Sequence, residues 1–162
     1  MIRQSLLAML FALPLAIPVL AQDHDHEHEA SEGNLTIVHP WARAASAGGE
    51  SMVFFEIENA GEAVDLTGAE TEIAASVELI GAALGTDANQ TWQPVGAVSV
   101  AAGDFVLEPS GLGFRLTGLT QDLGQGEDFE MEVEFGDGTH IHVHVEIEAA
   151  DATQHSHAGH SH

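Results

Sequence analysis

Cysteine is absent from this sequence, and basic residues are scarce. Without cysteine the chain can form neither a disulfide framework nor a thiolate metal site, and it has no cysteine nucleophile. Three basic residues stand against 26 acidic ones, the formal net charge is −23, and only Arg43 and Arg115 lie beyond the first 21 residues. A charge of this sign repels nucleic acid and anionic lipid and attracts cations. Because it would serve equally well as a solubility adaptation, it excludes nucleic-acid binding without identifying a ligand.

The motifs of several enzyme classes are missing as well. The sequence has no Gly-x-Ser-x-Gly nucleophile elbow, no His-Glu-x-x-His zinc motif and no glycine-rich phosphate-binding loop. Its Asp137-Gly138 pair lacks the spacing of a calcium loop. These absences predict a binding protein and not an enzyme.

A long apolar run occurs at residues 6–20. It follows Arg3 and ends in VLA at residues 19–21, which offers small residues to a signal peptidase. Prolines interrupt the run, and it is shorter than the ~20 apolar residues that a membrane helix needs. We therefore predict a signal peptide at residues 1–21, a periplasmic location, and no membrane span once the signal is removed.

The central region, residues 34–148, contains short runs in which apolar and polar residues alternate, separated by Gly, Asp and Asn. No long helical pattern interrupts them. Many short strands at this spacing predict one all-β domain, a Greek-key β-sandwich or barrel. The predicted strands are residues 35–41, 52–58, 64–70, 77–80, 92–100, 105–108, 114–119, 129–135 and 139–148.

Segments rich in histidine flank this domain. Residues 22–33 alternate histidine with acidic residues, and residues 149–162 end in HSHAGHSH. Neither has apolar periodicity, so both are predicted to be disordered tails. Flexible His and carboxylate pairs suit the capture of metal ions without a defined geometry, although such a tail can also be merely solubilising. The candidate tail ligands are His24, His26, His28, His155, His157, His160 and His162.

Residues 139–148, THIHVHVEIE, alternate two residue classes without a break. Successive side chains of a strand point to opposite faces, so one face supplies isoleucine and valine to the core. The other face presents His140, His142 and His144, here called the His ladder. Same-face residues are about 6.5–7 Å apart, so neighbouring imidazoles can converge on one ion. We predict a metal site there; the alternative is a solvated face whose His and Glu pair across strands.

The preceding run, residues 129–135, has the same parity, and this parity places Met131 in the core. A three-residue loop, GDG at 136–138, joins the two runs. Opposite residues of an antiparallel pair share a face, which requires an odd number of loop residues. Gly138 can adopt the positive φ of such a turn. The facing carboxylates are predicted either to accept the second N–H of each imidazole or to bind the ion directly. The predicted pairs are Glu134 with His140, Glu132 with His142, and Glu130 with His144.

Six stretches occur in a characteristic order: HPWAR at 39–43, MVFFEIENAG at 52–61, SVEL at 76–79, WQPV at 92–95, LEPSG at 107–111 and LTGL at 116–119. Together they resemble the PCu(A)C family of periplasmic copper chaperones over residues 35–147. The resemblance implies a cupredoxin-like β-barrel and a copper-chaperone function. His39, inside the first stretch, is predicted to be mainly structural.

The resemblance also implies a copper site made of a His, ten residues, a Met, twenty-one residues and then His-x-Met. This thioether and imidazole set suits Cu(I). Aligned after SVEL, the motif falls on positions that hold no metal ligand, so the sequence predicts that the usual site is absent. Those positions are Ile80, Thr91, Gly113 and Arg115.

The combined prediction is a periplasmic metal-binding protein, a copper chaperone or buffer, that captures ions on its tails and holds one on the His ladder. Imidazole with carboxylate favours Cu(II) over Cu(I). The predicted partners are metal ions and a metal-accepting periplasmic or membrane protein such as a cytochrome oxidase assembly component. Zinc binding or delivery on the same scaffold is one alternative. A non-metal interaction domain with a degenerate copper site is another.

Overall fold

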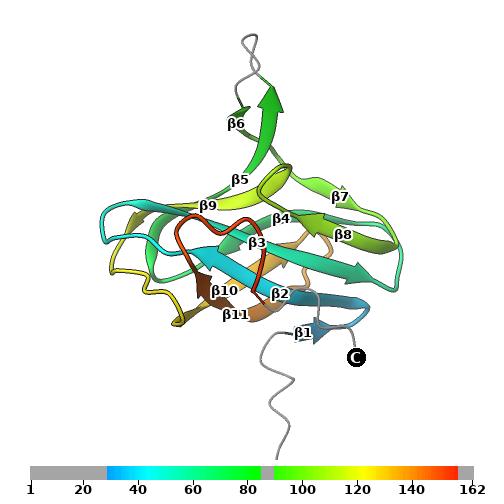
Figure 1. Cartoon of the computed structure of the whole chain (residues 1–162). Coiled ribbons are helices and arrows are strands. Elements are labelled where there is room, and N and C mark those ends of the chain that lie inside the picture. The colour runs from blue at the N-terminus through cyan, green and yellow to red at the C-terminus, as the bar shows by residue number, and fades with distance from the viewer. Residues whose placement is uncertain (1–28, 85–89, 157–162) are drawn as a thin grey trace, which may run out of the picture.

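The computed structural model describes residues 29–84 and 90–156, in which the regular elements are β-strands (Figure 1). These residues include no helix that is long and apolar enough to cross a membrane. The strands are β1 (Glu29–Glu32), β2 (Leu35–Arg43), β3 (Glu50–Asn59), β4 (Val64–Glu70), β5 (Ala74–Leu84), β6 (Gln90–Pro94), β7 (Val98–Val100), β8 (Gly103–Leu107), β9 (Leu112–Leu119), β10 (Asp128–Phe135) and β11 (His140–Glu148).

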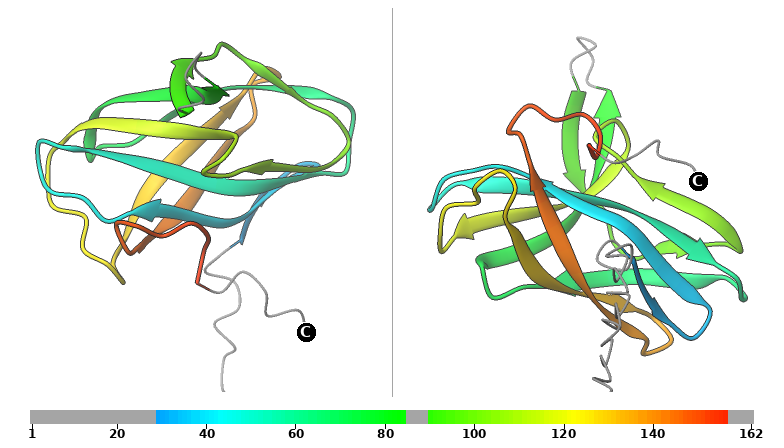
Figure 2. Two further views of the ribbon diagram at one scale, coloured as in Figure 1. Left: turned by 45° about the horizontal axis from the view of Figure 1, so that its top comes forward. Right: turned by 60° about the horizontal axis from the view of Figure 1, so that its bottom comes forward.

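The strands form one hydrogen-bonded sheet in the order β6-β5-β9-β3-β2-β11-β10-β4-β7, with β1 added to β2 and β8 added to β3. The sheet folds over, so that β10 and β11 cross behind β3 and β9 in the left view of Figure 2. Strands β11 and β2 run parallel, whereas the other paired strands are antiparallel. The predicted all-β, cupredoxin-like Greek-key fold is confirmed.

The single strand predicted for residues 92–100 is instead two strands, β6 and β7. Strand β6 pairs with β5 and ends at Pro94, whereas β7 pairs with β4 on the other side of the fold. Proline has no backbone N–H to donate, so it cannot extend a ladder inside a sheet. The chain therefore changes partner just after Pro94.

Strand β1 lies within residues 22–33, the segment predicted to be a disordered tail. Its residues pair with the first half of β2 through a turn in which Gly33 has a φ of 62°. Strand β11 pairs with β2 only from Trp41 to Arg43, which leaves the backbone of the first half open to another strand. Because backbone pairing needs no apolar periodicity, the hydrophobic pattern does not reveal this strand.

The β10–β11 hairpin has the predicted register. Glu134, Glu132 and Glu130 lie opposite the three histidines in the predicted order, and Gly138 in the connecting turn has a φ of 88°. The Asp137 carboxylate accepts the Thr139 N–H at 2.9 Å, and this hydrogen bond lowers the pKa of Asp137. The predicted parity is confirmed too, because the apolar face is buried and the His ladder is exposed.

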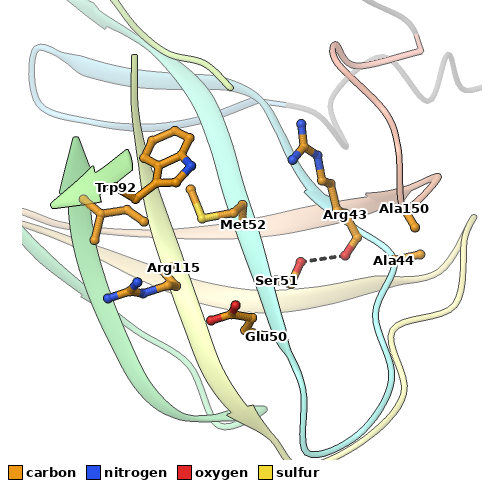
Figure 3. Close-up of a pocket in the computed structure, with 9 residues that line it drawn as sticks. Arg43, Ala44, Glu50, Ser51, Met52, Trp92, Arg115 and Ala150 are labelled. Atoms are coloured by element: carbon orange, nitrogen blue, oxygen red, sulfur yellow. Dashed lines mark hydrogen bonds between the residues drawn. The ribbon is translucent and has the colours of Figure 1, made fainter. Parts of the chain in front are cut away.

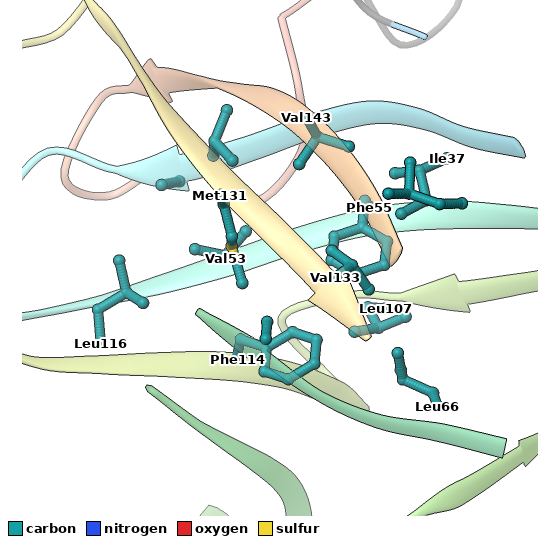
Figure 4. Close-up of a cluster of buried hydrophobic side chains, with 14 of the residues drawn as sticks. Ile37, Val53, Phe55, Leu66, Leu107, Phe114, Leu116, Met131, Val133 and Val143 are labelled. Atoms are coloured by element: carbon teal, nitrogen blue, oxygen red, sulfur yellow. The ribbon is translucent and has the colours of Figure 1, made fainter. Parts of the chain in front are cut away.

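Apolar side chains from both sides of the folded sheet meet in one core (Figure 4). Val53 and Phe114 are fully buried, and Met131, predicted to be a core residue, is only 1% exposed. Burying one such side chain contributes about 1.5–3 kcal/mol. Because the chain has no disulfide, this core is what holds the barrel together.

Strand β2 changes partner in its middle, where its pairing register with β3 shifts between Val38 and Trp41. His39 lies in this break with a φ of 52°, a left-handed conformation that is uncommon outside glycine. Residues 149–156, here called the C-terminal segment, leave β11 and turn back along the end of β2 (Figure 2). Arg43 Nε donates a hydrogen bond of 2.9 Å to the Ala152 carbonyl and ties the segment to this strand.

Candidate metal centre

The His ladder and the carboxylates of β10 meet at Glu132. One oxygen of Glu132 lies 2.8 Å from His140 Nδ1, and its other oxygen lies 2.8 Å from His142 Nε2. Glu132 lies directly opposite His142 and one diagonal step from His140, and both positions are within reach of a side chain across an antiparallel pair. One carboxylate thus joins two of the three imidazoles.

The third imidazole of the ladder has a different partner. His144 Nδ1 lies 3.3 Å from an Asp128 carboxylate oxygen, although Glu130 is the residue directly opposite. The ladder therefore divides into a pair, His140 and His142, that shares Glu132, and a third histidine next to Asp128. The structure places all three on one face but does not bring their ring nitrogens to one point.

Three side chains have ligand atoms close enough to hold one ion. Atoms of Glu132, Glu134 and His140 all lie within 4.8 Å of one another. The hydrogen bond to Glu132 raises the pKa of His140, and nearby carboxylates at Glu134 and Glu70 raise it further. An imidazole must be neutral to bind a metal, so the raised pKa of His140 makes protons stronger competitors for an ion at this position. The cluster thus combines one nitrogen donor with two carboxylates. His142 lies next to it and contacts the Glu132 oxygen that does not contact His140.

Two of the four positions of the PCu(A)C copper motif line a pocket of about 260 Å³ (Figure 3). Its lining includes Ile80 and Arg115, and Arg115 is held by an ion pair with Glu78, with 2.5 Å between nitrogen and oxygen. Met52 also lines the pocket, and Figure 3 shows its side chain turned toward Trp92. A single thioether beside a guanidinium does not form the soft donor set that Cu(I) prefers.

Gly113 shows why a ligand does not fit at the third position of that motif. A Cβ built there would lie 2.7 Å from Phe54 Cε1 and 3.1 Å from Met52 Cε. Phe54 is fully buried and packs against Trp41, with 4.9 Å between ring centroids, so moving its ring would disturb this contact. A larger side chain at position 113 is thus excluded for steric reasons in this structure.

A second cluster of metal-ligating side chains lies at the other end of β11. His155 Nε2 is 2.9 Å from a Glu146 oxygen and 3.8 Å from a Glu148 oxygen. Ligand atoms of these three residues lie within 4.8 Å of one another. The sequence predicted His155 as a ligand in a disordered tail, whereas it is buried in the structure, with 2% exposure.

The sequence pattern offered a partial signal for this cluster. Glu146 and Glu148 continue the alternation of residues 139–148, which places them on the same face as the His ladder. Nothing in the pattern indicated that the C-terminal segment returns to cover them. The predicted signal peptide lies outside the described residues. So do the other predicted tail ligands, which are His24, His26, His28, His157, His160 and His162.

Fold and site together define a cupredoxin-like β-domain that presents histidine and carboxylate side chains on its last hairpin. Solved structures share this fold. The apo PCuAC domain from PmoF1 is 24% identical with a TM-score of 0.65, and the match covers 75% of this chain and 99% of that one. The copper-bound PCuAC domain from PmoF2 is 21% identical with a TM-score of 0.62, covering 75% and 98%.

A third solved structure comes from Deinococcus radiodurans. The Cu(I) form of its protein DR1885 is 21% identical with a TM-score of 0.53, and the match covers 73% of this chain and 82% of that one. At these identities the likeness establishes the fold, and it confirms the fold that the resemblance to PCu(A)C domains implied. No curated protein matches the sequence. The family comparison matches residues 35–147 to a family described as putative lipoprotein LpqE-like, and the chain belongs to this LpqE-like family.

Proposed function

We propose that this protein is an extracytoplasmic copper-binding protein, a chaperone or buffer, that holds Cu²⁺ on the exposed face of the β10–β11 hairpin. The observation that carries the proposal is Glu132, whose two carboxylate oxygens each lie 2.8 Å from a different imidazole of the His ladder. The copper-bound structures of PCuAC domains with this fold support copper as the cargo.

The donor atoms favour the oxidised ion. Imidazole nitrogen and carboxylate oxygen bind Cu(II) more strongly than other divalent ions of the first transition series, whereas Cu(I) prefers thioether and thiolate sulfur. Sulfur is poorly supplied here, because Met131 is buried in the core and Met52 lies beside Arg115 in the pocket. The proposed site therefore differs from the soft His and Met set in both position and chemistry.

Exposure of the site supports a carrier role. The side chains of His140, His142 and His144 are 48%, 78% and 61% exposed, so an acceptor protein can reach a bound ion directly. The His-rich tails would raise the local ion concentration next to the ladder by tethering. Transfer would proceed by ligand exchange to a metal-accepting periplasmic or membrane protein, without catalysis. The description of the family as putative lipoproteins supports a location outside the cytoplasm, for which we propose the periplasm.

Zinc is the second candidate cargo. The cluster of Glu132, Glu134 and His140 has one nitrogen and otherwise oxygen donors, a set that Zn²⁺ also accepts. Competition between Zn²⁺ and Cu²⁺ for the same protein separates the two, and zinc binding that excess Cu²⁺ fails to displace would favour zinc as the cargo.

The decisive experiment compares two triple variants of the protein without its first 21 residues. One variant replaces the His ladder, His140, His142 and His144, with alanine, and the matched control replaces three tail histidines, His24, His26 and His28. Cu²⁺ titration followed by electron paramagnetic resonance should show that the ladder variant binds one ordered, nitrogen-coordinated copper fewer than the parent protein, whereas the control keeps it. Tight Cu(I) binding that survives in the ladder variant, without such a Cu²⁺ signal in the parent, would refute the proposal.

A further inference from the structure

We propose that Glu146, Glu148 and His155 form a second, buried metal site, which binds a divalent transition-metal ion such as Zn²⁺ or Cu²⁺ and locks the C-terminal segment onto the barrel. This inference deepens the proposed metal-binding function and rests on it. It differs from the His ladder in its residues, in its burial and in the part of the chain that it orders.

The distances between donor atoms fit a small metal ion. Bonds of 2.0–2.2 Å in a tetrahedral site place neighbouring ligand atoms about 3.4 Å apart. The two distances from His155 Nε2, 2.9 Å to Glu146 and 3.8 Å to Glu148, lie on either side of that value. Shifts of about 0.5 Å in side-chain position would therefore suffice to form the site.

Burial distinguishes this cluster from ordinary surface ion pairs. The side chains of His155 and Glu148 are 2% and 9% exposed, and that of Glu146 is 25% exposed. The two carboxylates and the imidazole offer oxygen and nitrogen donors of the kind that a divalent transition-metal ion binds. A divalent cation bound between them would neutralise both carboxylates while the imidazole stays neutral.

The backbone around the cluster holds the ligands in place. Glu146 and Glu148 are the last outward-facing residues of β11, where this strand runs parallel to β2 and Glu148 lies beside Arg43. His155 follows a turn that is closed by a hydrogen bond from the Ala152 N–H to the Ala149 carbonyl, with 2.9 Å between nitrogen and oxygen. The Ser156 N–H then donates to Glu148 Oε1 at 2.6 Å. The site thus has two ligands on a rigid strand and one on a segment that returns to it.

His39 is placed to complete the coordination. Its ring lies 5.7 Å from the His155 ring, measured between centroids, at the break where β2 changes partner. His39 is exposed and adopts a left-handed backbone conformation, and such conformations are found at functional sites when the surrounding structure holds them. Rotation of its side chain would bring a second nitrogen donor to the ion, giving the four ligands typical of zinc.

The test compares two single-histidine variants of the protein without its first 21 residues, His155→Ala and His157→Ala. Both remove one histidine near the C-terminus, but only the first removes a proposed ligand. With Zn²⁺ or Cu²⁺ added alone, calorimetric titration should show that His155→Ala loses one tight equivalent and that His157→Ala keeps it. Backbone amide signals of Glu148 and Ser156 should shift with that equivalent in the parent protein and stay unchanged in His155→Ala.

Because His155 is buried, its replacement could loosen the segment for steric reasons, so a second variant keeps the shape. Glu146→Gln with Glu148→Gln removes both charges at nearly constant volume and should also lose the tight equivalent. If His155→Ala and His157→Ala lose the same amount of metal, the binding is diffuse tail capture and the proposal fails. If all these variants keep the full stoichiometry, the cluster is only a structural ion pair, and the proposal fails too.

The same titration separates this site from the His ladder. Replacing His140, His142 and His144 should remove the ladder equivalent and leave the Glu148 and Ser156 amide shifts intact. If those shifts vanish in the ladder variant, the two clusters do not bind independently and a separate buried site is refuted. Loss of copper in the ladder variant together with unchanged binding in His155→Ala would leave the proposed function standing and overturn this inference alone.

Discussion

Replacing Gly113 with alanine should destabilise the barrel, although alanine adds only one methyl group. The new Cβ would lie 2.7 Å from Phe54 Cε1, 3.0 Å from Phe54 Cδ1 and 3.1 Å from Met52 Cε. Real Cβ atoms do not approach ring carbons so closely, and Phe54 is fully buried. The ring or the β9 backbone must therefore shift within a core that is already close-packed.

The expected cost follows from the energetics of overpacking. Extra methyl groups in a packed core typically destabilise by about 1–3 kcal/mol. For a domain of this size, that corresponds to a decrease in Tm of roughly 3–5 °C for each kcal/mol. Thermal unfolding followed by near-ultraviolet circular dichroism gives the transition directly, because Trp41 packs against Phe54 and reports on this region.

Gly96→Ala is the matched control, since nothing lies within 4 Å of a Cβ at that position. It should leave the free energy of unfolding unchanged or raise it by about 0.4–1 kcal/mol, as alanine restricts the unfolded chain. In a Phe54→Leu background the cost of Gly113→Ala should fall, because the ring edge is gone. A Gly113→Ala protein as stable as the Gly96→Ala control would refute the steric exclusion at position 113.

Three other outcomes are expected. Glu132→Gln should weaken Cu²⁺ binding at the His ladder by roughly 10–100-fold in a chelator competition assay, because the carboxylate contacts two of its imidazoles, and unchanged affinity would contradict its central role. In the metal-free protein, nuclear magnetic resonance titration should give His140 a pKa above the usual 6.5, and this pKa should decrease toward 6.5 in Glu132→Gln. Because the pKa is raised in the folded state, the contact with Glu132 stabilises the fold fully below the unfolded pKa of the imidazole. This stabilisation is lost as pH rises through the folded pKa. Met131→Ala should lower the free energy of unfolding by about 2–5 kcal/mol without reducing copper stoichiometry in the folded protein, and loss of copper would mean that Met131 is a ligand.

The last hairpin was predictable from the sequence because strict alternation fixes a strand face. The parity of residues 129–135 and 139–148 allowed one register with a three-residue loop, and the structure has that register. The side-chain contacts were less predictable. Cross-strand geometry permits diagonal pairs as well as direct ones, and the structure pairs Glu132 with His140 in addition to His142, while Asp128 replaces Glu130 as the contact of His144.

The elements that the sequence did not reveal are those held by backbone pairing or by polar contacts. Strand β1 adds to the open half of β2 through main-chain hydrogen bonds, which leave no hydrophobic pattern. Polar contacts hold the C-terminal segment in place: Arg43 donates to the Ala152 carbonyl, the Ser156 amide donates to Glu148, and His155 contacts Glu146. Periodicity reports on which face a core covers, so it cannot report on segments that cover a polar face.

The outer face of β11 therefore changes character along its length. Five side chains with metal-ligating atoms alternate with core residues from one end of the strand to the other, spanning about 27 Å at 3.4 Å per residue. The histidines at the beginning are exposed, whereas Glu146 is partly covered and Glu148 is buried, because β2 and the C-terminal segment close over that end. An ion at the proposed exposed site would exchange with water or an acceptor, while an ion at the proposed covered site would leave only after the segment opens. The two proposed sites thus lie on one strand with a single alternating pattern, and what distinguishes them is the segment that returns to cover one end.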